Sequence, residues 1–76
     1  MKIQIIGPGC PKCRQLAANA EQAAREAGCD AEIEKVTDLG RIMDLGVMLT
    51  PALAVDGRVK VSGHVASVEE IKALLG

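Results

Sequence analysis

The sequence contains no phenylalanine, tyrosine or tryptophan, so every large side chain available for a core is aliphatic or a methionine. A core of this kind in 76 residues is small, and we expect residues 1–76 to form a single domain. Hydrophobic residues nevertheless make up 49% of the chain, which favours a globular protein over a disordered one.

Other absences narrow the classes of partner and the location. The formal net charge is −1 and no basic run occurs, so we expect neither nucleic acid nor an acidic membrane as a partner. No apolar stretch approaches the roughly 20 residues of a membrane-spanning helix. Met1 and Lys2 lead directly into a strand pattern with no signal peptide, so we expect a cytoplasmic protein. In that compartment two cysteines spaced C-x-x-C indicate redox or metal chemistry more often than a structural disulfide.

Hydrophobic periodicity and turn residues predict the element order β-α-β-α-β-β-α. The predicted strands are Lys2–Ile6, Ala31–Val36, Ala52–Val55 and Arg58–Val61. The first and second strands flank a helix and should therefore be parallel. Asp56-Gly57 is typical of a two-residue type I′ hairpin turn and should make the last two strands antiparallel. Together these features predict an α/β fold with a mixed four-stranded sheet flanked by helices.

Three helices are predicted between and after these strands. The first begins at Pro11 and is stopped by Gly28. Its predicted buried stripe consists of small residues and one leucine: Leu16, Ala17, Ala20, Ala23, Ala24 and Ala27. A short second helix, capped by Thr37-Asp38 and closed by Gly46, carries Leu39, Ile42 and Met43. The third opens on a capping box, Ser67-Val68-Glu69-Glu70, and should bury Val68, Ile71, Leu74 and Leu75.

The residues Cys10-Pro11-Lys12-Cys13 follow a Gly7-Pro8-Gly9 turn and open the long first helix. A helix N-terminus favours the thiolate form of Cys10, and cysteines three residues apart lie close enough to form a disulfide. Such a disulfide closes so short a loop that it would stabilise the fold by only about 2 kcal/mol. We therefore predict a reversible dithiol/disulfide pair, with Cys10 as the nucleophile and Cys13 as the resolving thiol. Pro11 would stiffen the turn, and Lys12 would favour the Cys10 thiolate.

Three segments carry a resemblance to the small, glutaredoxin-sized thioredoxin-like redox-active disulfide proteins. They are G-P-G-C-P-K-C at 7–13, T-P-A-L-A-V-D-G at 50–57 and V-A-S-V-E-E-I-K-A-L-L at 65–75. The resemblance implies a minimal thioredoxin fold and a thiol–disulfide oxidoreductase that acts on protein disulfides. It also implies no bound cofactor beyond the Cys10–Cys13 disulfide, and a separate reductase of the flavin-dependent thioredoxin reductase type.

The same resemblance implies roles for Thr50 and Pro51. Proline at the position of Pro51 is cis in the family and packs against the disulfide. The Thr50 backbone would then face outward, where an extended substrate segment could pair with it.

The sequence also departs from its relatives at places that matter for function. Larger thioredoxins have a tryptophan just before the first cysteine, where this chain has Pro8-Gly9. They also have an acid in the strand before the motif, but Lys2–Ile6 has none, so water or another carboxylate would move the proton of the resolving thiol. Ser62-Gly63-His64 and Ser67-Val68-Glu69 replace the segment with which glutaredoxins grip glutathione. Exchange with protein dithiols is therefore favoured over direct use of glutathione.

Two alternatives stay open at this point. A soft-metal carrier of Cu(I) or Zn²⁺ also places C-x-x-C between a first strand and a first helix. Such modules have methionine where this chain has Pro8, and they end on a strand rather than a helix; we assign no metal ligand. A redox sensor without turnover would have the same sequence features. Cys29 is interpreted as a partly buried or incidental thiol and His64 as a solvated surface residue.

Overall fold

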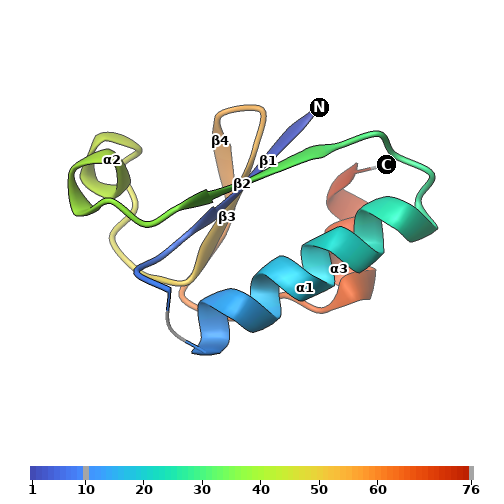
Figure 1. The fold of residues 1–76 in the computed structure, drawn as a ribbon, viewed down its shortest axis with the longest axis horizontal. Helices are drawn as coiled ribbons and strands as arrows, with labels where there is room; N and C mark the ends of the chain where they lie inside the picture. The colour runs from blue at the N-terminus through green and yellow to red at the C-terminus, as the bar shows by residue number, and fades with distance from the viewer. Residues whose placement is uncertain (10, 76) are drawn as a thin grey trace.

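The structure is a computed structural model that describes residues 1–9 and 11–75. It contains seven elements in the predicted order (Figure 1). Their bounds are β1 Lys2–Ile6, α1 Pro11–Glu26, β2 Glu32–Val36, α2 Leu39–Asp44, β3 Ala52–Val55, β4 Arg58–Ser62 and α3 Val68–Leu75. Within the described residues, no helix is both long and apolar enough to cross a membrane.

The four strands form one mixed sheet in the order β2-β1-β3-β4. Strand β1 is parallel to β2 and antiparallel to β3, and β3 is antiparallel to β4. The hairpin between β3 and β4 turns at Asp56 and Gly57, with φ angles of 51° and 84°. Positive φ at both residues is what a type I′ turn requires, so the predicted turn and the predicted mixed sheet are both confirmed.

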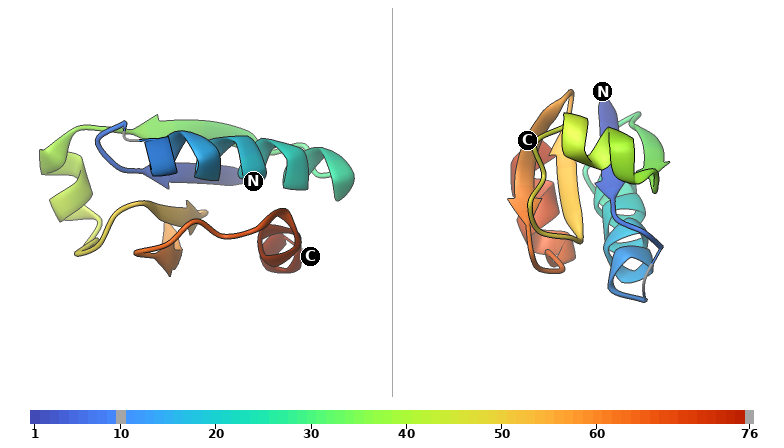
Figure 2. Two further views of the ribbon diagram at one scale, coloured as in Figure 1. Left: turned by 90° about the horizontal axis from the view of Figure 1, so that it is seen from below. Right: turned by 90° about the vertical axis from the view of Figure 1, so that its left-hand side faces the viewer.

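Helices α1 and α3 cover one face of the sheet (Figures 1 and 2). The core between them is built from aliphatic side chains, including Ile3, Ile5, Leu16, Leu53 and Ile71. Alanines on the buried side of α1 let this helix lie close to the sheet, because they add almost no side-chain thickness. The predicted α1 stripe is buried as far as its last residue but one.

The exception is Ala27, which is exposed because α1 ends at Glu26. After the end of α1, the Cys29 N–H donates to the Ala24 carbonyl at 2.9 Å, and the Gly28 N–H donates to the Arg25 carbonyl at 3.1 Å. With Gly28 at a φ of 65°, these bonds form a Schellman ending. Gly28 is therefore the C′ residue that the sequence predicted.

On the opposite face, α2 covers only the end of the sheet at which β1 and β2 terminate (Figures 1 and 2). Of the three apolar side chains expected on α2 only Ile42 is buried, in a small cluster with Ile6 and Val36. Leu39 is 68% exposed and Met43 is 76% exposed. A six-residue helix makes less than two turns, so only one of its side chains points squarely at the sheet.

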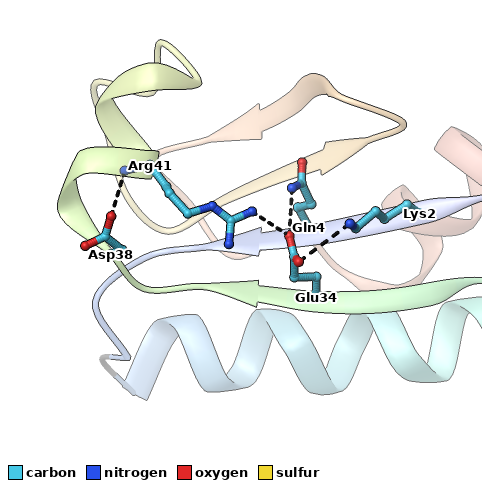
Figure 3. A network of polar contacts seen from close by, with 5 residues as sticks. All are labelled: Lys2, Gln4, Glu34, Asp38 and Arg41. Atoms are coloured by element: carbon cyan, nitrogen blue, oxygen red, sulfur yellow. Dashed lines mark hydrogen bonds and ion pairs between the residues drawn. The ribbon is translucent and has the colours of Figure 1, made fainter.

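A polar network joins α2 to the uncovered part of this face (Figure 3). The Glu34 carboxylate accepts hydrogen bonds from Gln4 Nε2 and Arg41 Nη2, both at 2.9 Å, and lies 3.5 Å from Lys2 Nζ. The Gln4 hydrogen bond and then the Arg41 hydrogen bond lower the pKa of Glu34. Asp38 caps α2 by accepting from the Arg41 N–H at 3.1 Å. The network therefore holds α2 against the sheet.

Candidate active site

Three segments meet where β1 ends: the turn at Gly7, the first turn of α1 at Cys13 six residues later, and the loop before β3 at Thr50, which is distant in sequence from both. A carbon added at the Cβ position of Gly7 would overlap the Cys13 sulfur and lie 3.7 Å from Thr50 Cβ. Gly7 is also anchored to β2, because its N–H donates to the Val36 carbonyl at 2.9 Å. The sequence predicts only a turn at Gly7, and no local signal indicates this close approach to the sulfur.

Cys13 is 5% exposed and lies in the first turn of α1, which begins at Pro11. Pro11 and Lys12 are exposed in the same turn. Cys10, the predicted nucleophile, lies outside the described residues. Within the described part of the motif, a buried sulfur is therefore flanked by an exposed proline and an exposed ammonium group.

Thr50 and Pro51 form the second wall of the site, and the peptide bond between them is cis, as the family resemblance implies. Pro51 is buried, and its carbonyl accepts a hydrogen bond from the Gly63 N–H at 2.9 Å. Thr50 is exposed, and within residues 1–9 and 11–75 its backbone makes no hydrogen bond. The Thr50 backbone is thus available to an extended segment of another chain.

A hollow of about 30 Å³ lies beside Cys13. Its described lining consists of Ile5, Gly7, Gly9, Cys13, Arg14, Lys35 and Thr37. No carboxylate occurs among these residues. Glu34 cannot serve here, because its neighbours Ile33 and Lys35 point to the α1 side while Glu34 joins Gln4 and Arg41 on the other face. Of the two proton carriers considered from the sequence, water is the one consistent with this lining.

Cys29 and His64 lie outside this hollow. Cys29 is half-buried at the end of α1, with its sulfur 3.6 Å from Met1 Sδ, and it lines a separate groove of about 320 Å³. His64 is exposed, with Nε2 3.6 Å from Glu70 Oε2. Across residues 1–9 and 11–75, no three His, Cys, Asp or Glu side chains gather as metal ligands. The sequence interpretation of Cys29 as partly buried and of His64 as a surface residue agrees with these positions.

Comparison with known proteins places this arrangement in a family. The family model of the thioredoxin domain matches residues 1–76. The chain is 51% identical over 75 residues to a thioredoxin of Methanothermobacter thermautotrophicus, covering 99% of this chain and 97% of that protein. It is 49% identical over 70 residues to a thioredoxin of Methanocaldococcus jannaschii, covering 92% of this chain and 80% of that protein. With the mixed sheet, the cis bond before Pro51 and the buried Cys13, these matches lead to one conclusion: the chain belongs to the thioredoxin family and is a disulfide oxidoreductase.

Proposed function

We propose that the chain exchanges electrons with protein disulfides through Cys10 and Cys13. The observation that carries the proposal is the position of Cys13, a buried sulfur in the first turn of α1 packed against Gly7 and beside Thr50. Cys10 immediately precedes Pro11, the first residue of α1, in the sequence. A pair so placed suits disulfide exchange, in which one thiolate attacks a substrate and the other releases it.

The exchange conserves atoms and electrons in two steps. The Cys10 thiolate attacks one sulfur of the substrate disulfide, which forms a mixed disulfide and releases the other substrate sulfur as a thiolate. Cys13 then loses its proton to water and attacks the Cys10 sulfur. This second step forms the Cys10–Cys13 disulfide and releases the second substrate thiolate. The substrate is reduced by two electrons and the chain is oxidised by two.

Substrate binding is assigned to Thr50 and Pro51. The Thr50 backbone has no hydrogen-bond partner within the described ranges 1–9 and 11–75, so an extended substrate segment can pair with it as an added strand. Pro51 is buried next to Thr50 and has no backbone N–H, so it does not compete with Thr50 as a hydrogen-bond donor to that segment. Pairing of this kind recognises the substrate backbone and accepts many side chains.

The proposal extends to partners and location. The substrates are proteins that carry disulfides, and a separate reductase of the flavin-dependent thioredoxin reductase type returns the chain to its dithiol form. The chain needs no bound cofactor, because the redox centre is its own pair of thiols. The protein is placed in the cytoplasm, where its dithiol form can be regenerated.

A redox titration of the purified, metal-free protein tests the exchange pair. Free thiols are trapped by alkylation at a series of potentials and counted by intact mass and peptide mapping. We expect the Cys10 and Cys13 thiols to disappear together between about −180 and −300 mV, the range of known exchange proteins and cytosolic glutathione. A Cys29→Ser variant is the matched control and should titrate with the same midpoint.

Trapping assigns the two roles in the same protein. Cys13→Ser should accumulate mixed disulfides through Cys10, because the releasing thiol is gone; accumulation in Cys10→Ser instead would reverse the roles. If no intramolecular disulfide forms in that potential window, the exchange mechanism is wrong. Titration of the reduced protein with Cu(I) would then test the soft-metal carrier.

A further inference from the structure

Two cationic side chains line the hollow beside Cys13, and a third lies in the same turn of α1. Arg14 and Lys35 line it, and Lys12 is exposed in the same first turn of α1. We call Lys12, Arg14 and Lys35 the cationic rim. No member of the rim forms an ion pair with any residue in 1–9 or 11–75. By contrast, Lys2, Arg41 and Lys72 are each paired with a glutamate elsewhere on the molecule.

No acidic residue in the described ranges 1–9 and 11–75 forms an ion pair with this rim. Glu34 is held on the opposite face of the sheet by Gln4 and Arg41. Glu21 and Glu26 lie in the last two turns of α1, away from its cationic N-terminus. Asp38 directly follows Thr37 of the hollow, and its side chain caps α2. The chain carries a net charge of −1, yet the described lining of the hollow contains two cationic side chains and no carboxylate.

Two exposed apolar side chains lie in the loop that leads to Thr50. Met48 is 93% exposed and Leu49 is 61% exposed, and both immediately precede Thr50. Exposed apolar side chains next to Thr50 suit contact with a protein more than with a nucleic acid, which would require a longer basic tract. The occupant of this surface is therefore a folded or extended protein segment.

We propose that the cationic rim selects protein partners whose exchangeable disulfide is flanked by carboxylates. This inference rests on the proposed function and specifies which protein disulfides are preferred, namely those with negative charge beside them. Acidic residues beside the partner disulfide would approach Lys12, Arg14 and Lys35 while the sulfurs meet at the motif. The N-terminal end of α1 adds a partial positive charge in the same direction.

The cationic rim should act mainly on the rate at which the protein and an acidic partner associate. Charges as exposed as these are screened over about 10 Å at 0.1 M salt, so each contributes little to the stability of a complex. Complementary charge around a site nevertheless raises association rates by factors of 10 to 1,000 at low salt. We expect an acidic disulfide to react about tenfold faster than a neutral one at low ionic strength, with the difference shrinking as salt is added.

Three peptide disulfides that differ only in their flanking residues test the proposal. They carry glutamate, glutamine or lysine on both sides of the same cystine, and each is reduced by the wild-type dithiol form at low and high salt. The readout is the ratio of the rate on the acidic peptide to the rate on the neutral one. Using this ratio removes any effect of a charge change on the intrinsic reactivity of the thiols.

The variants reverse the charge of the rim. In Arg14→Glu/Lys35→Glu the ratio should fall below one, and Arg14→Gln/Lys35→Gln should give an intermediate value. Arg25→Glu is the matched control, because Arg25 is also on α1 and without an ion pair among the described residues but lines the groove at Cys29 instead. It should retain the wild-type ratio. Circular dichroism of each variant verifies that the fold is kept.

The outcomes separate the two proposals. A wild-type ratio near one at low salt, or a preference that survives charge reversal, overturns the selection of acidic partners while the exchange function stands. A change in the ratio equally large in Arg25→Glu also overturns it, because net charge would then suffice without the rim. If wild-type protein reduces none of the three peptides, the proposed function itself fails.

Discussion

At the scale of single residues, Gly7 shows how closely the backbone of this protein approaches the Cys13 sulfur. The space that a side chain would fill at this position is occupied by the Cys13 sulfur, with Thr50 just beyond. The position needs glycine for that contact and not for an unusual backbone, since Gly7 is not among the residues with positive φ. Gly9, two residues later, is glycine for the other reason, with a φ of 89° and open space around it.

Gly7→Ala should therefore disturb both stability and the site. The added methyl must displace Cys13 or the turn, and overpacking of this kind costs about 1–3 kcal/mol in free energy of unfolding. We expect a lower urea midpoint for the dithiol form and a changed rate of Cys13 alkylation. Gly40→Ala is the control, because the added carbon there meets only the Asp38 side chain, at 3.2 Å. Equal stability and equal alkylation in Gly7→Ala would show that the site tolerates a side chain at this position.

At the scale of elements, α3 is held in place by the capping box at its N-terminus. Ser67 Oγ accepts from the Glu70 N–H at 3.2 Å, and Glu70 Oε1 accepts from the Ser67 N–H at 3.3 Å. The hydrogen bond from the Ser67 backbone is the main reason that the pKa of Glu70 lies below its usual value of 4.5. This cap matters to the site, because the loop before it contains Gly63, whose N–H binds the Pro51 carbonyl.

The lowered pKa predicts how stability should change with pH. Folding favours the ionised form of Glu70. The contribution of Glu70 to the stability of the fold is therefore complete above about pH 4.5, and it is lost as the pH falls through the lower pKa of the folded state. Glu70→Gln should therefore lower Tm at pH 7 by a few degrees. The difference in Tm between wild type and this variant should become smaller as the pH approaches 3. Glu69→Gln, which removes a carboxylate from the same turn without touching the cap, is the control. A difference in Tm between wild type and Glu70→Gln that stays constant from pH 7 to 3 would show that ionised Glu70 does not stabilise the fold in this way.

At the scale of the whole molecule, the absence of aromatic residues makes the protein dependent on a few branched side chains. Ile71 of α3 is fully buried among side chains of α1, β1, β3 and β4. It therefore joins both helices of the covered face to the sheet. Small domains are stable by only about 5–15 kcal/mol, so one such residue carries a large share of the stability.

Ile71→Ala should lower the free energy of unfolding by about 2–5 kcal/mol, because it removes three carbons and leaves a cavity that the backbone cannot close. Urea denaturation followed by far-UV circular dichroism measures this change. Met43→Ala is the control, since that side chain is 76% exposed, and its effect should stay within about 0.5 kcal/mol. Comparable losses in the two variants would mean that the core is not organised around Ile71.

Most of the fold could be predicted from the sequence, because its signals are local. Strand alternation, the Asp56-Gly57 turn, Gly28 at the end of α1 and the Ser67 cap each depend on neighbours within a few residues. The predicted bounds differ from the structure by no more than one residue at β2 and β4. The least accurate part was the burial of α2, because Leu39 and Met43 have helical spacing but the helix is too short to turn them toward the sheet.

The sequence by itself predicted the element order and the family, and it is the source of the proposal that Cys10 and Cys13 form the redox centre. Only the tertiary structure decided what surrounds Cys13, because Lys35 and Thr50 reach it through strand pairing and a crossover rather than through proximity in sequence. The structure also showed that Glu34 lies on the face of the sheet opposite to Cys13, whereas Arg14 and Lys35 line the hollow beside Cys13. Periodicity tells which residues share a face of one strand, but the face that meets the first turn of α1 is chosen by the packing of the whole sheet.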